Sequence, residues 1–201
     1  MKPISLALFT ILLFASCSSD SDDQSTSFFN LHQGNLWVYK RYFSYDNLTF
    51  NPSNEIDSVR VVGDTLINSL TYAKLVHSNF NGPHKEFLRV DTDGHLVNEN
   101  GLVIHSGIDI EYQHVRPYLV GGIVNIGTIS EQLQDPFITN IEGTDYFVYS
   151  YYGTFVPNDS QFPSSNLFYQ YTEGIGLVCQ HIPQASGYNC FEDRLVYYVL
   201  N

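Results

Sequence analysis

The stretch DYFVYSYYGTF, residues Asp145–Phe155, is the most aromatic segment of the chain. Aromatic and β-branched side chains are enriched in β-strands, because they pack well on a pleated surface. Successive side chains of a strand point to opposite faces of the sheet, and here both faces are apolar or aromatic. The stretch therefore predicts a central strand, with one face on the core and the other lining a concavity or lying under a loop. Tyr149, Tyr151 and Tyr152 become candidates for contacts with a ligand.

Turn signals separate further strand-like segments on both sides of this stretch. Asp93-Gly94 and Asn100-Gly101 are typical of tight hairpins, because glycine readily adopts the positive φ that such turns need. No segment shows a sustained helical period with caps, so we expect at most one or two short helices, around Ser130–Gln134 or in loops. The other expected strands are Leu36–Phe43, Ile56–Val62, Thr71–His77, Glu86–Asp91, Leu96–Asn98, Ile108–Val115, Val124–Ile129, Leu167–Tyr171, Leu177–Ile182 and Arg194–Leu200.

This pattern decides the fold class. About ten short strands separated by turns predict an antiparallel all-β domain with minor α content. Such a sheet must curl or fold over itself to bury one face. The serial hairpins favour an up-and-down curled sheet or half-open barrel, and a β-sandwich is the alternative. The chain has 201 residues, which fits one β-rich domain with a good core at residues 28–201.

The first residues form a separate segment. Lys2 and the apolar run Ile4–Phe14 precede the tetrad Phe14-Ala15-Ser16-Cys17. The pattern is typical of a secretory signal, and the apolar run is too short to span a bilayer as a helix. The tetrad resembles the lipobox of bacterial lipoproteins, although Phe14 stands where leucine is usual. The resemblance implies that residues 1–16 are removed and that Cys17 receives the acyl chains. An ordinary secretory signal is the alternative.

The residues after Cys17 suggest a cellular address. Residues 18–27 are serine, threonine, aspartate and glutamine only, so we expect residues 17–27 to form a lipidated, flexible tether. Ser18–Asp23 is similar to the export signal of Bacteroidetes surface lipoproteins. Three further segments resemble uncharacterised lipoproteins of that group: GNLWVY at 34–39, VVGDTLIN at 61–68 and YTEGIGLV at 171–178. The resemblance implies anchoring to the outer membrane, with the cell surface favoured over the periplasmic face, and it brings no known activity.

The charge of the chain limits its partners. Removal of residues 1–16 takes away Lys2 and no acidic residue, so the formal charge changes from −12 to −13. Such an acidic surface repels nucleic-acid phosphates and anionic lipid head groups. We therefore expect no nucleic-acid partner. Attachment to the membrane should come from the acyl chains on Cys17, since two or more chains suffice for stable anchoring. The ligand or protein partner and the oligomeric state remain open.

Two cysteines remain if Cys17 is acylated. Cys179 and Cys190 flank Gln180–Asn189, whose proline, serine and glycine favour a turn between two strands. The compartment of an exported protein is oxidising. We therefore expect a disulfide between Cys179 and Cys190, which would stabilise the fold by roughly 3 kcal/mol in the chain-entropy model. Two free thiols are the alternative.

Signals for catalysis or metal binding are weak. The sequence has no Gly-x-Ser-x-Gly, His-Glu-x-x-His or Cys-x-x-Cys motif. Its seven histidines lie far apart, which favours scattered surface histidines over a metal site built from neighbouring strands. Asp91-Thr92-Asp93-Gly94 could begin a calcium loop, but the distal ligands of that pattern are missing, so we expect a plain turn. We expect no metal and no cofactor.

Two weaker assignments concern modification and ligand binding. Ser58 and Thr65 follow aspartate and precede an aliphatic residue, which resembles the pattern that Bacteroidetes O-glycosylate in exported proteins. Trp37, the only tryptophan, lies early in the first expected strand. Its ring could stack on a sugar, but a core anchor is the favoured interpretation at such a position.

Three functions are compatible with these observations. A non-catalytic surface module that binds a glycan or an uptake partner predicts exposed aromatic rings, with Trp37, Tyr149, Tyr151 and Tyr152 as candidates. A carrier of an apolar ligand predicts a deep cavity lined by Phe, Leu and Tyr. A hydrolase predicts a cleft with paired carboxylates or a histidine of perturbed pKa. We rank them in that order, because no catalytic motif is present.

Overall fold

The computed structural model describes residues 28–46, 48–79, 82–108, 113–120, 124–183 and 189–201. Within these ranges the regular secondary structure consists of β-strands alone. No helix in them is long and apolar enough to cross a membrane. The thirteen strands are β1 (Leu36–Ser44), β2 (Asn51–Ile67), β3 (Leu70–Asn79), β4 (Gly82–Val90), β5 (Leu96–Asn98), β6 (Val103–His105), β7 (Gln113–Val120), β8 (Val124–Leu133), β9 (Phe137–Ile141), β10 (Thr144–Pro157), β11 (Ser165–Thr172), β12 (Gly176–Pro183) and β13 (Cys190–Val199).

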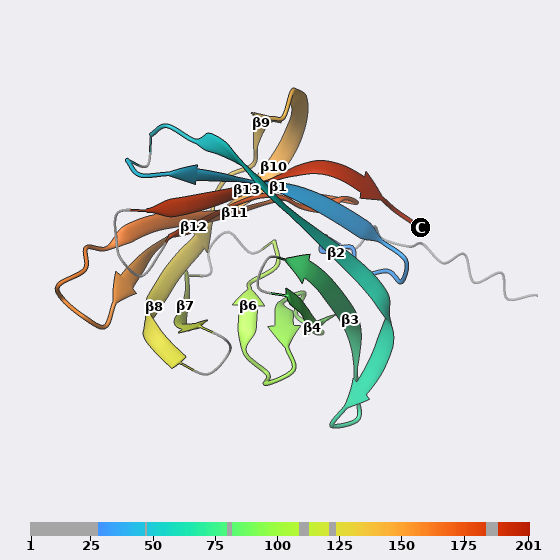
Figure 1. The fold of residues 1–201 in the computed structure, drawn as a ribbon. Helices are drawn as coiled ribbons and strands as arrows, with labels where there is room; N and C mark the ends of the chain where they lie inside the picture. The colour runs from blue at the N-terminus through green and yellow to red at the C-terminus, as the bar shows by residue number, and fades with distance from the viewer. Residues whose placement is uncertain (1–27, 47, 80–81, 109–112, 121–123, 184–188) are drawn as a thin grey trace, which may run out of the picture.

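Hydrogen bonds join these strands into one antiparallel sheet. The strand order is β6-β5-β4-β3-β2-β1-β13-β12-β11-β10-β8-β7, and β9 pairs with the first part of β10. The sheet curls until its edge strands β6 and β7 come near each other, which gives a nearly closed barrel with one seam (Figure 1). The expectation of an all-β, antiparallel, curled sheet is confirmed.

The short helix expected around Ser130–Gln134 is wrong. Residues up to Leu133 belong to β8, in which Ile129, Glu131 and Leu133 are buried and alternate with more exposed neighbours. This period of two is that of a strand with one buried face. Pairing with β7 and β10 on both sides then satisfies the backbone.

The core fills the inside of the barrel. Inward residues on several strands are buried, among them Val61 of β2, Tyr151 and Phe155 of β10 and Val178 of β12. Trp37 is also buried, and its indole Nε1 donates a hydrogen bond to the carbonyl oxygen of Ile175 at 2.6 Å. The interpretation of Trp37 as a core anchor is therefore confirmed.

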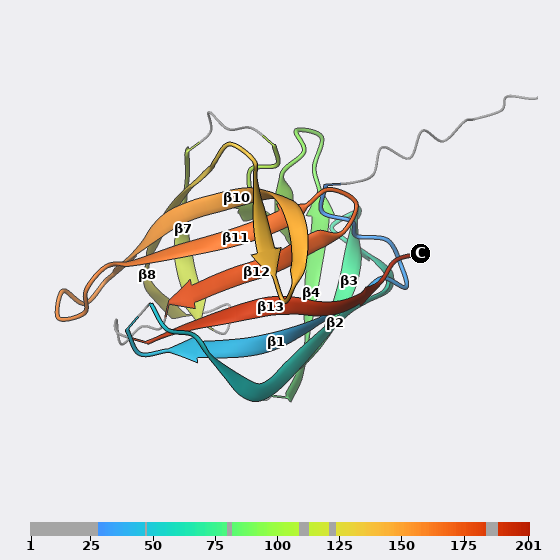
Figure 2. The same ribbon diagram turned by 90° about the horizontal axis from the view of Figure 1, so that it is seen from above.

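Tight turns connect neighbouring strands where the sequence predicted them. Gly94 and Gly101 have φ values of +84° and +78°, in agreement with the two expected hairpin turns. A further turn at Glu142 and Gly143 joins β9 to β10, and this hairpin crosses the outer side of β11 and β12 (Figure 2). Arg194 of β13 reaches it through Nη1, which lies 3.4 Å from Oε1 of Glu142. The hairpin thus covers part of the outer surface of the barrel.

The expected disulfide is not formed, and both cysteines are free and buried. Cys190 is paired with Pro183 in the sheet, whereas Cys179 is paired with Arg194. Pro183 lies four positions after Cys179 on β12, a distance of roughly 13 Å along a strand. A disulfide needs Cα atoms within about 7 Å of each other. The prediction failed because it used the loop length and not the register of the two strands.

This register predicts the behaviour of the thiols. Burial raises the pKa of the Cys190 thiol to about 11 and raises that of Cys179 as well, so both should react slowly in the native state. In a Cys17→Ser variant exported to an oxidising compartment, we expect two reactive thiols per chain after denaturation without reductant. A thiol assay before and after denaturation measures this, and no thiol in the denatured, unreduced protein would contradict the register.

Candidate functional site

A pocket of about 600 Å³ lies on the outer surface of the barrel. It forms where the connection from β8 to β9 passes over the outer faces of β10 and β11. We call it the outer pocket. Its lining combines three aromatic rings with amide, hydroxyl and carboxylate groups, contributed by Gln134, Asp135, Phe137, Ser150, Tyr152, Phe168 and Gln170.

Strand register brings the floor of the outer pocket together. Tyr152 of β10 is paired with Phe168 of β11, and Ser150 is paired with Gln170. Residues two apart on a strand share a face, and paired residues point the same way. The four side chains therefore form a compact block on the outer face. Phe137, at the start of β9, adds a third ring to the lining.

The outer pocket offers both exposed rings and unused hydrogen-bonding capacity. The Tyr152 and Phe137 side chains are 45% and 41% exposed. Gln170 is only 9% exposed, and its side-chain amide forms no hydrogen bond within the part of the chain that the structure describes. Its amide nitrogen and oxygen are not among the fully buried side-chain atoms that lack a partner in the described residues, so they keep contact with solvent. A ligand in the outer pocket could form hydrogen bonds with this amide in place of water.

The four tyrosine and tryptophan candidates occupy different environments. Trp37 and Tyr151 are buried in the barrel, with exposed fractions of 4% and 0%. Tyr149 is half-buried, and its ring centroid lies 5.2 Å from that of Phe28. Tyr152 alone among the four lines the outer pocket. The alternation expected for Asp145–Phe155 is present at Tyr151 and Tyr152, which face the core and the outside.

Polar residues also gather inside the barrel at its seam. We call His105, His114, Arg116 and Glu131 the seam cluster; all four are buried. Oε1 of Glu131 lies 3.0 Å from Nδ1 of His105 and 3.4 Å from Nδ1 of His114. Its Oε2 lies 3.6 Å from Nη2 of Arg116. The cluster joins β6 to β7 and β8, so it bridges the seam of the sheet.

Charges within the seam cluster fix its protonation. Burial by itself raises the pKa of Glu131, but His105, His114 and Arg116 outweigh it and lower the pKa to about 2. Burial lowers the pKa of His105, against the attraction of Glu131. At neutral pH we therefore describe a neutral His105 that donates from Nδ1 to an ionised Glu131, with Arg116 as the cationic partner.

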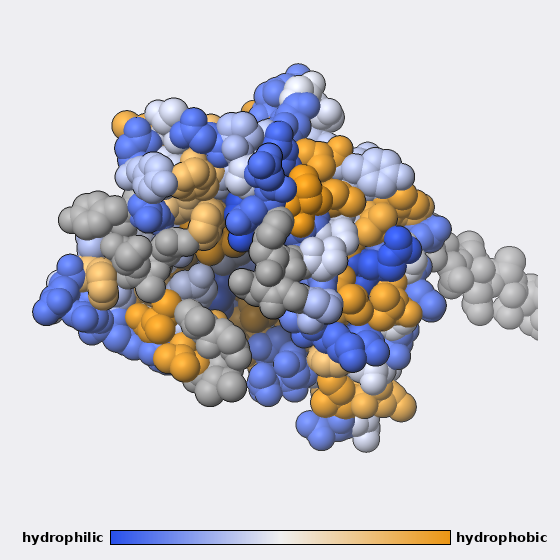
Figure 3. Space-filling view, viewed as in Figure 1, coloured by the Kyte–Doolittle hydropathy of each residue, from blue (hydrophilic) through white to orange (hydrophobic). Residues whose placement is uncertain are grey.

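A second interior group, here called the charged row, contains Arg41, Asp57, His77, Glu86 and Asp193. Arg41 binds Asp193 through two hydrogen bonds, from Nε to Oδ1 at 2.7 Å and from Nη2 to Oδ2 at 2.9 Å. His77 lies between Asp57 and Glu86, with Nδ1–Oδ2 and Nε2–Oε2 distances of 3.3 and 3.2 Å. Burial lowers the pKa of His77, but the two carboxylates raise it by more, so that the pKa is about 9. Figure 3 shows that the face of the molecule seen in Figure 1 is hollowed, with hydrophilic surface visible inside.

Glu131→Gln should destabilise the protein by about 3 kcal/mol at pH 7, because Arg116 would keep its buried charge without a carboxylate partner. The pKa of Glu131 is about 2 in the fold and 4.5 as the ordinary value. Its stabilisation is therefore complete above pH 4.5 and is lost as the pH falls from 4.5 towards 2. Urea unfolding at pH 7, 4 and 3 measures both effects.

The control for this variant is Glu99→Gln, in a turn outside the seam cluster, which should change the free energy of unfolding by less than about 0.5 kcal/mol. The difference between wild type and Glu131→Gln should shrink as the pH falls to 3. A difference that does not depend on pH would show that Glu131 is not ionised in the folded protein.

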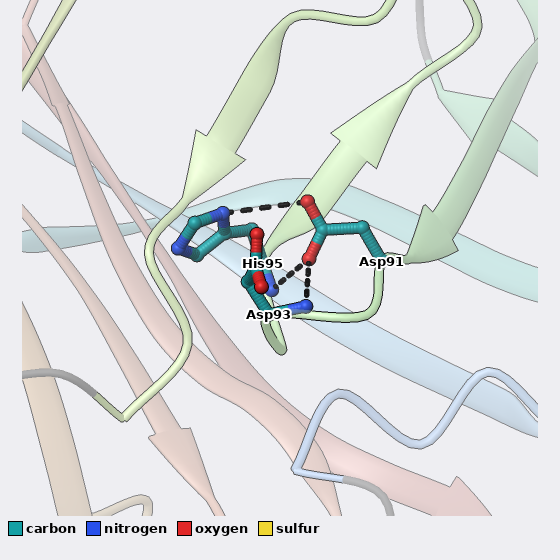
Figure 4. A group of neighbouring side chains, drawn as sticks. All are labelled: Asp91, Asp93 and His95. Atoms are coloured by element: carbon teal, nitrogen blue, oxygen red, sulfur yellow. Dashed lines mark hydrogen bonds and ion pairs between the residues drawn. The ribbon is translucent and has the colours of Figure 1, made fainter.

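The Asp91–His95 segment forms the expected turn. Oδ1 of Asp91 accepts hydrogen bonds from the backbone N–H groups of Asp93 and His95, at 3.0 and 2.8 Å (Figure 4). Ligand atoms of these three residues lie within 4.8 Å of one another. The backbone already uses Oδ1 of Asp91, and its Oδ2 lies 3.3 Å from Nδ1 of His95. These hydrogen bonds and the ion pair are typical of a turn, and they explain why the three side chains lie close together.

The remaining predicted sites lie on β2 or outside the described residues. Ser58 is on β2, where its hydroxyl lies 2.6 Å from that of Ser78. Thr65 is near the end of the same strand and is partly exposed. O-glycosylation of either residue stays a prediction. Cys17 and the tether precede the described residues.

The expectation of scattered surface histidines is wrong for several of them. His105 and His114 are buried, and His77 stacks on His84 with ring centroids 4.2 Å apart. Glu131 gave the clearest signal that was missed, since it stands between Ile129 and Leu133 on the buried face of β8. The position of Gln170 in the outer pocket could not be predicted, because no sequence pattern indicates that it is paired with Ser150.

Comparisons with known proteins give structural likenesses alone. No protein-family model matches the sequence, and no curated protein matches it. The structure is similar to that of a Bacteroides fragilis protein described as exported and as having a YmcC-like fold, with a TM-score of 0.49 and 10% identity. It is also similar to a protein from Parabacteroides distasonis described as a lipoprotein, with a TM-score of 0.43 and 14% identity. Each likeness covers 87% of this chain and 99% of the other.

Proposed function

We propose that this protein is a lipid-anchored, non-catalytic binding module of the bacterial cell envelope. The observation that supports ligand binding best is the outer pocket. There the half-exposed ring of Tyr152 stands beside the side-chain amide of Gln170, which forms no hydrogen bond within the described residues. Concave sites of this kind, with rings for contact area and a few polar groups for orientation, are typical of ligand binding. The ligand would present a flat apolar face to the rings and hydrogen-bonding groups to the amide.

The interior of the barrel supports this function less well. An apolar ligand would have to lie against the charged row, whose ion pairs it would strip of water. A hydrolase would need a reachable group that titrates near its working pH. His77 is held protonated at neutral pH between Asp57 and Glu86, and Glu131 is buried and ionised. The outer pocket needs neither an opening of the barrel nor a change of protonation.

Sequence features support the membrane anchor. The tetrad ending at Cys17 and the polar tether after it fit a lipoprotein that is held at the outer membrane by acyl chains. A tether would keep the barrel away from the lipid surface. The outer pocket would then be accessible to ligands, and we place it on the outer face of the cell.

Cys17→Ala should release the protein from the membrane, because the acyl chains would have no attachment site. Membrane fractionation and mass spectrometry of the N-terminal peptide measure this. Wild-type protein that lacks acyl mass would contradict the anchor. Surface display is a separate claim, tested with protease added to intact cells. It fails if the protein is cleaved only after the cells are lysed.

Tyr152→Ala should weaken ligand binding at the outer pocket about tenfold with little change in melting temperature, because the ring contributes contact area and is half exposed. We would label the tyrosines with ¹³C and add two probes, a mixture of neutral oligosaccharides from hydrolysed plant polysaccharide and a tryptic digest of casein. At least one probe should shift the Tyr152 ring signal.

Tyr197→Ala is the matched control, because Tyr197 is 56% exposed and lies outside the outer pocket. In the wild-type protein the ring signal of Tyr197 should not move when a probe is added. In the Tyr197→Ala variant the Tyr152 ring signal should still respond. No response of Tyr152 to either probe, or an equal response of Tyr197, would contradict a binding site in the outer pocket.

A further inference from the structure

The rings of the outer pocket continue beyond it as a row across the sheet. Tyr152 of β10 is paired with Phe168 of β11, and Phe168 is paired with His181 of β12. The Phe168 and His181 ring centroids lie 5.3 Å apart. Neighbouring strands are about 4.8 Å apart, so the row advances by one ring for each strand. Phe50 meets His181 edge to face at 5.7 Å and ends the row.

Polar groups run along one side of this ring row. Ser150 and Gln170 are paired on β10 and β11, two residues from Tyr152 and Phe168, on the same face of the sheet. Gln134 and Asp135 lie on the wall beside them. A saccharide ring has the matching chemistry, because its C–H groups form an apolar face and its hydroxyls lie around the edge. Amide and carboxylate side chains can each bind two neighbouring hydroxyls.

Charge selects among saccharides. Asp135 is the only ionisable side chain besides tyrosine in the lining of the outer pocket, and no cation lines it. His181 is neutral at pH 7, because burial lowers its pKa. The chain as a whole carries a formal charge of −12. Arg194 lies 5.9 Å over the Phe50 ring at the end of the row, but it is already paired with Glu142 and Glu192. An acidic ligand would therefore meet the carboxylate of Asp135 without a cation in the pocket lining, so the surface favours a neutral one.

The backbone beneath the ring row argues against an extended peptide that adds a strand there, although β9, which carries Phe137 at the side of the pocket, is paired only with β10. β10, β11 and β12 are hydrogen-bonded on both sides where the ring row crosses them, so they offer no free edge. Peptide binding by strand addition requires such an edge. A proline-rich peptide, which can lie on aromatic rings without backbone pairing, is the competing ligand that the experiment must test.

We infer that the ring row Tyr152–Phe168–His181 binds a linear, neutral oligosaccharide that lies across the strands, with successive sugar rings on successive side-chain rings. This inference rests on the proposed function, whose binding site it extends and whose ligand class it names. It makes the length of the ligand decisive, because a monosaccharide can contact one ring and a trisaccharide can contact three.

The test is a titration of the full mature chain with defined, linear oligosaccharides of glucose, xylose and N-acetylglucosamine, from one to four units long. For at least one series, the affinity should rise about tenfold or more between one and three units and then level off. Tyr152→Ala and Phe168→Ala should each weaken trisaccharide binding about tenfold. Tyr197→Ala should not, and circular dichroism checks that every variant is folded.

Three outcomes would overturn the inference. The first is affinity that does not depend on ligand length, and the second is equal binding of an acidic oligogalacturonate. The third is a response of Tyr152 to a proline-rich peptide and to no saccharide, which would leave the proposed function in place. If neither saccharide nor peptide shifts the Tyr152 signal, both the inference and the proposed function are wrong.

Discussion

The contact between His105 of β6 and Glu131 of β8 closes the barrel. Edge strands expose unpaired N–H and C=O groups, and the strand order leaves β6 and β7 as the two ends of the curled sheet, with β9 paired only to β10. Among the described residues no hydrogen-bonded ladder joins them. Instead Nδ1 of His105 lies 3.0 Å from Oε1 of Glu131, and the Tyr151 hydroxyl donates to the carbonyl oxygen of Gly107. Side chains hold the seam where the backbone does not, so the integrity of the core depends on a polar cluster.

This cluster also fixes the register that builds the outer surface. A Cβ atom at position 153 would clash with the carbonyl oxygen of Ser130 and lie 2.7 Å from Cβ of Glu131, so glycine allows β10 to approach the backbone of β8 closely beside Glu131. Side chains alternate between faces, so a slip of one residue would move Glu131 outside and leave Arg116 unpaired within. The register that keeps Glu131 inside sets Tyr152 on the outer face, one residue from Gly153 and opposite Phe168. The pairing of β8 with β10 therefore both buries the Glu131 carboxylate and exposes the Tyr152 ring.

Local patterns in the sequence were sufficient for the fold class, and long-range pairing explains the errors. The period of two in Asp145–Phe155 predicted opposite faces for Tyr151 and Tyr152, and Asp93-Gly94 predicted its hairpin, because both depend on neighbouring residues only. The disulfide failed because the relative shift of β12 and β13 is a property of the sheet. The prediction of scattered surface histidines was wrong for the same reason, because curling of the sheet brings His105 to Glu131, which is 26 residues away in the sequence. The outer pocket could not be predicted from local patterns, because it depends on a hairpin that crosses the outside of the barrel.

The fold assigns different work to its two faces. Inside, Arg41 is matched to Asp193, His77 to Asp57 and Glu86, and Arg116 to Glu131, so a ligand there would have to displace ion pairs, although Oδ1 of Asp57, Nε of Arg116 and Oε2 of Glu131 form no hydrogen bond within the described residues. Outside, the ring of Tyr152 is exposed and the amide of Gln170 forms no hydrogen bond within the described residues, so a ligand could add interactions there without breaking an ion pair. The strands beneath are paired on both sides, which holds these groups in place before binding and lowers its entropic cost. A ligand on the outer face would therefore meet exposed rings and a solvent-accessible amide, whereas one inside the barrel would have to displace buried ion pairs.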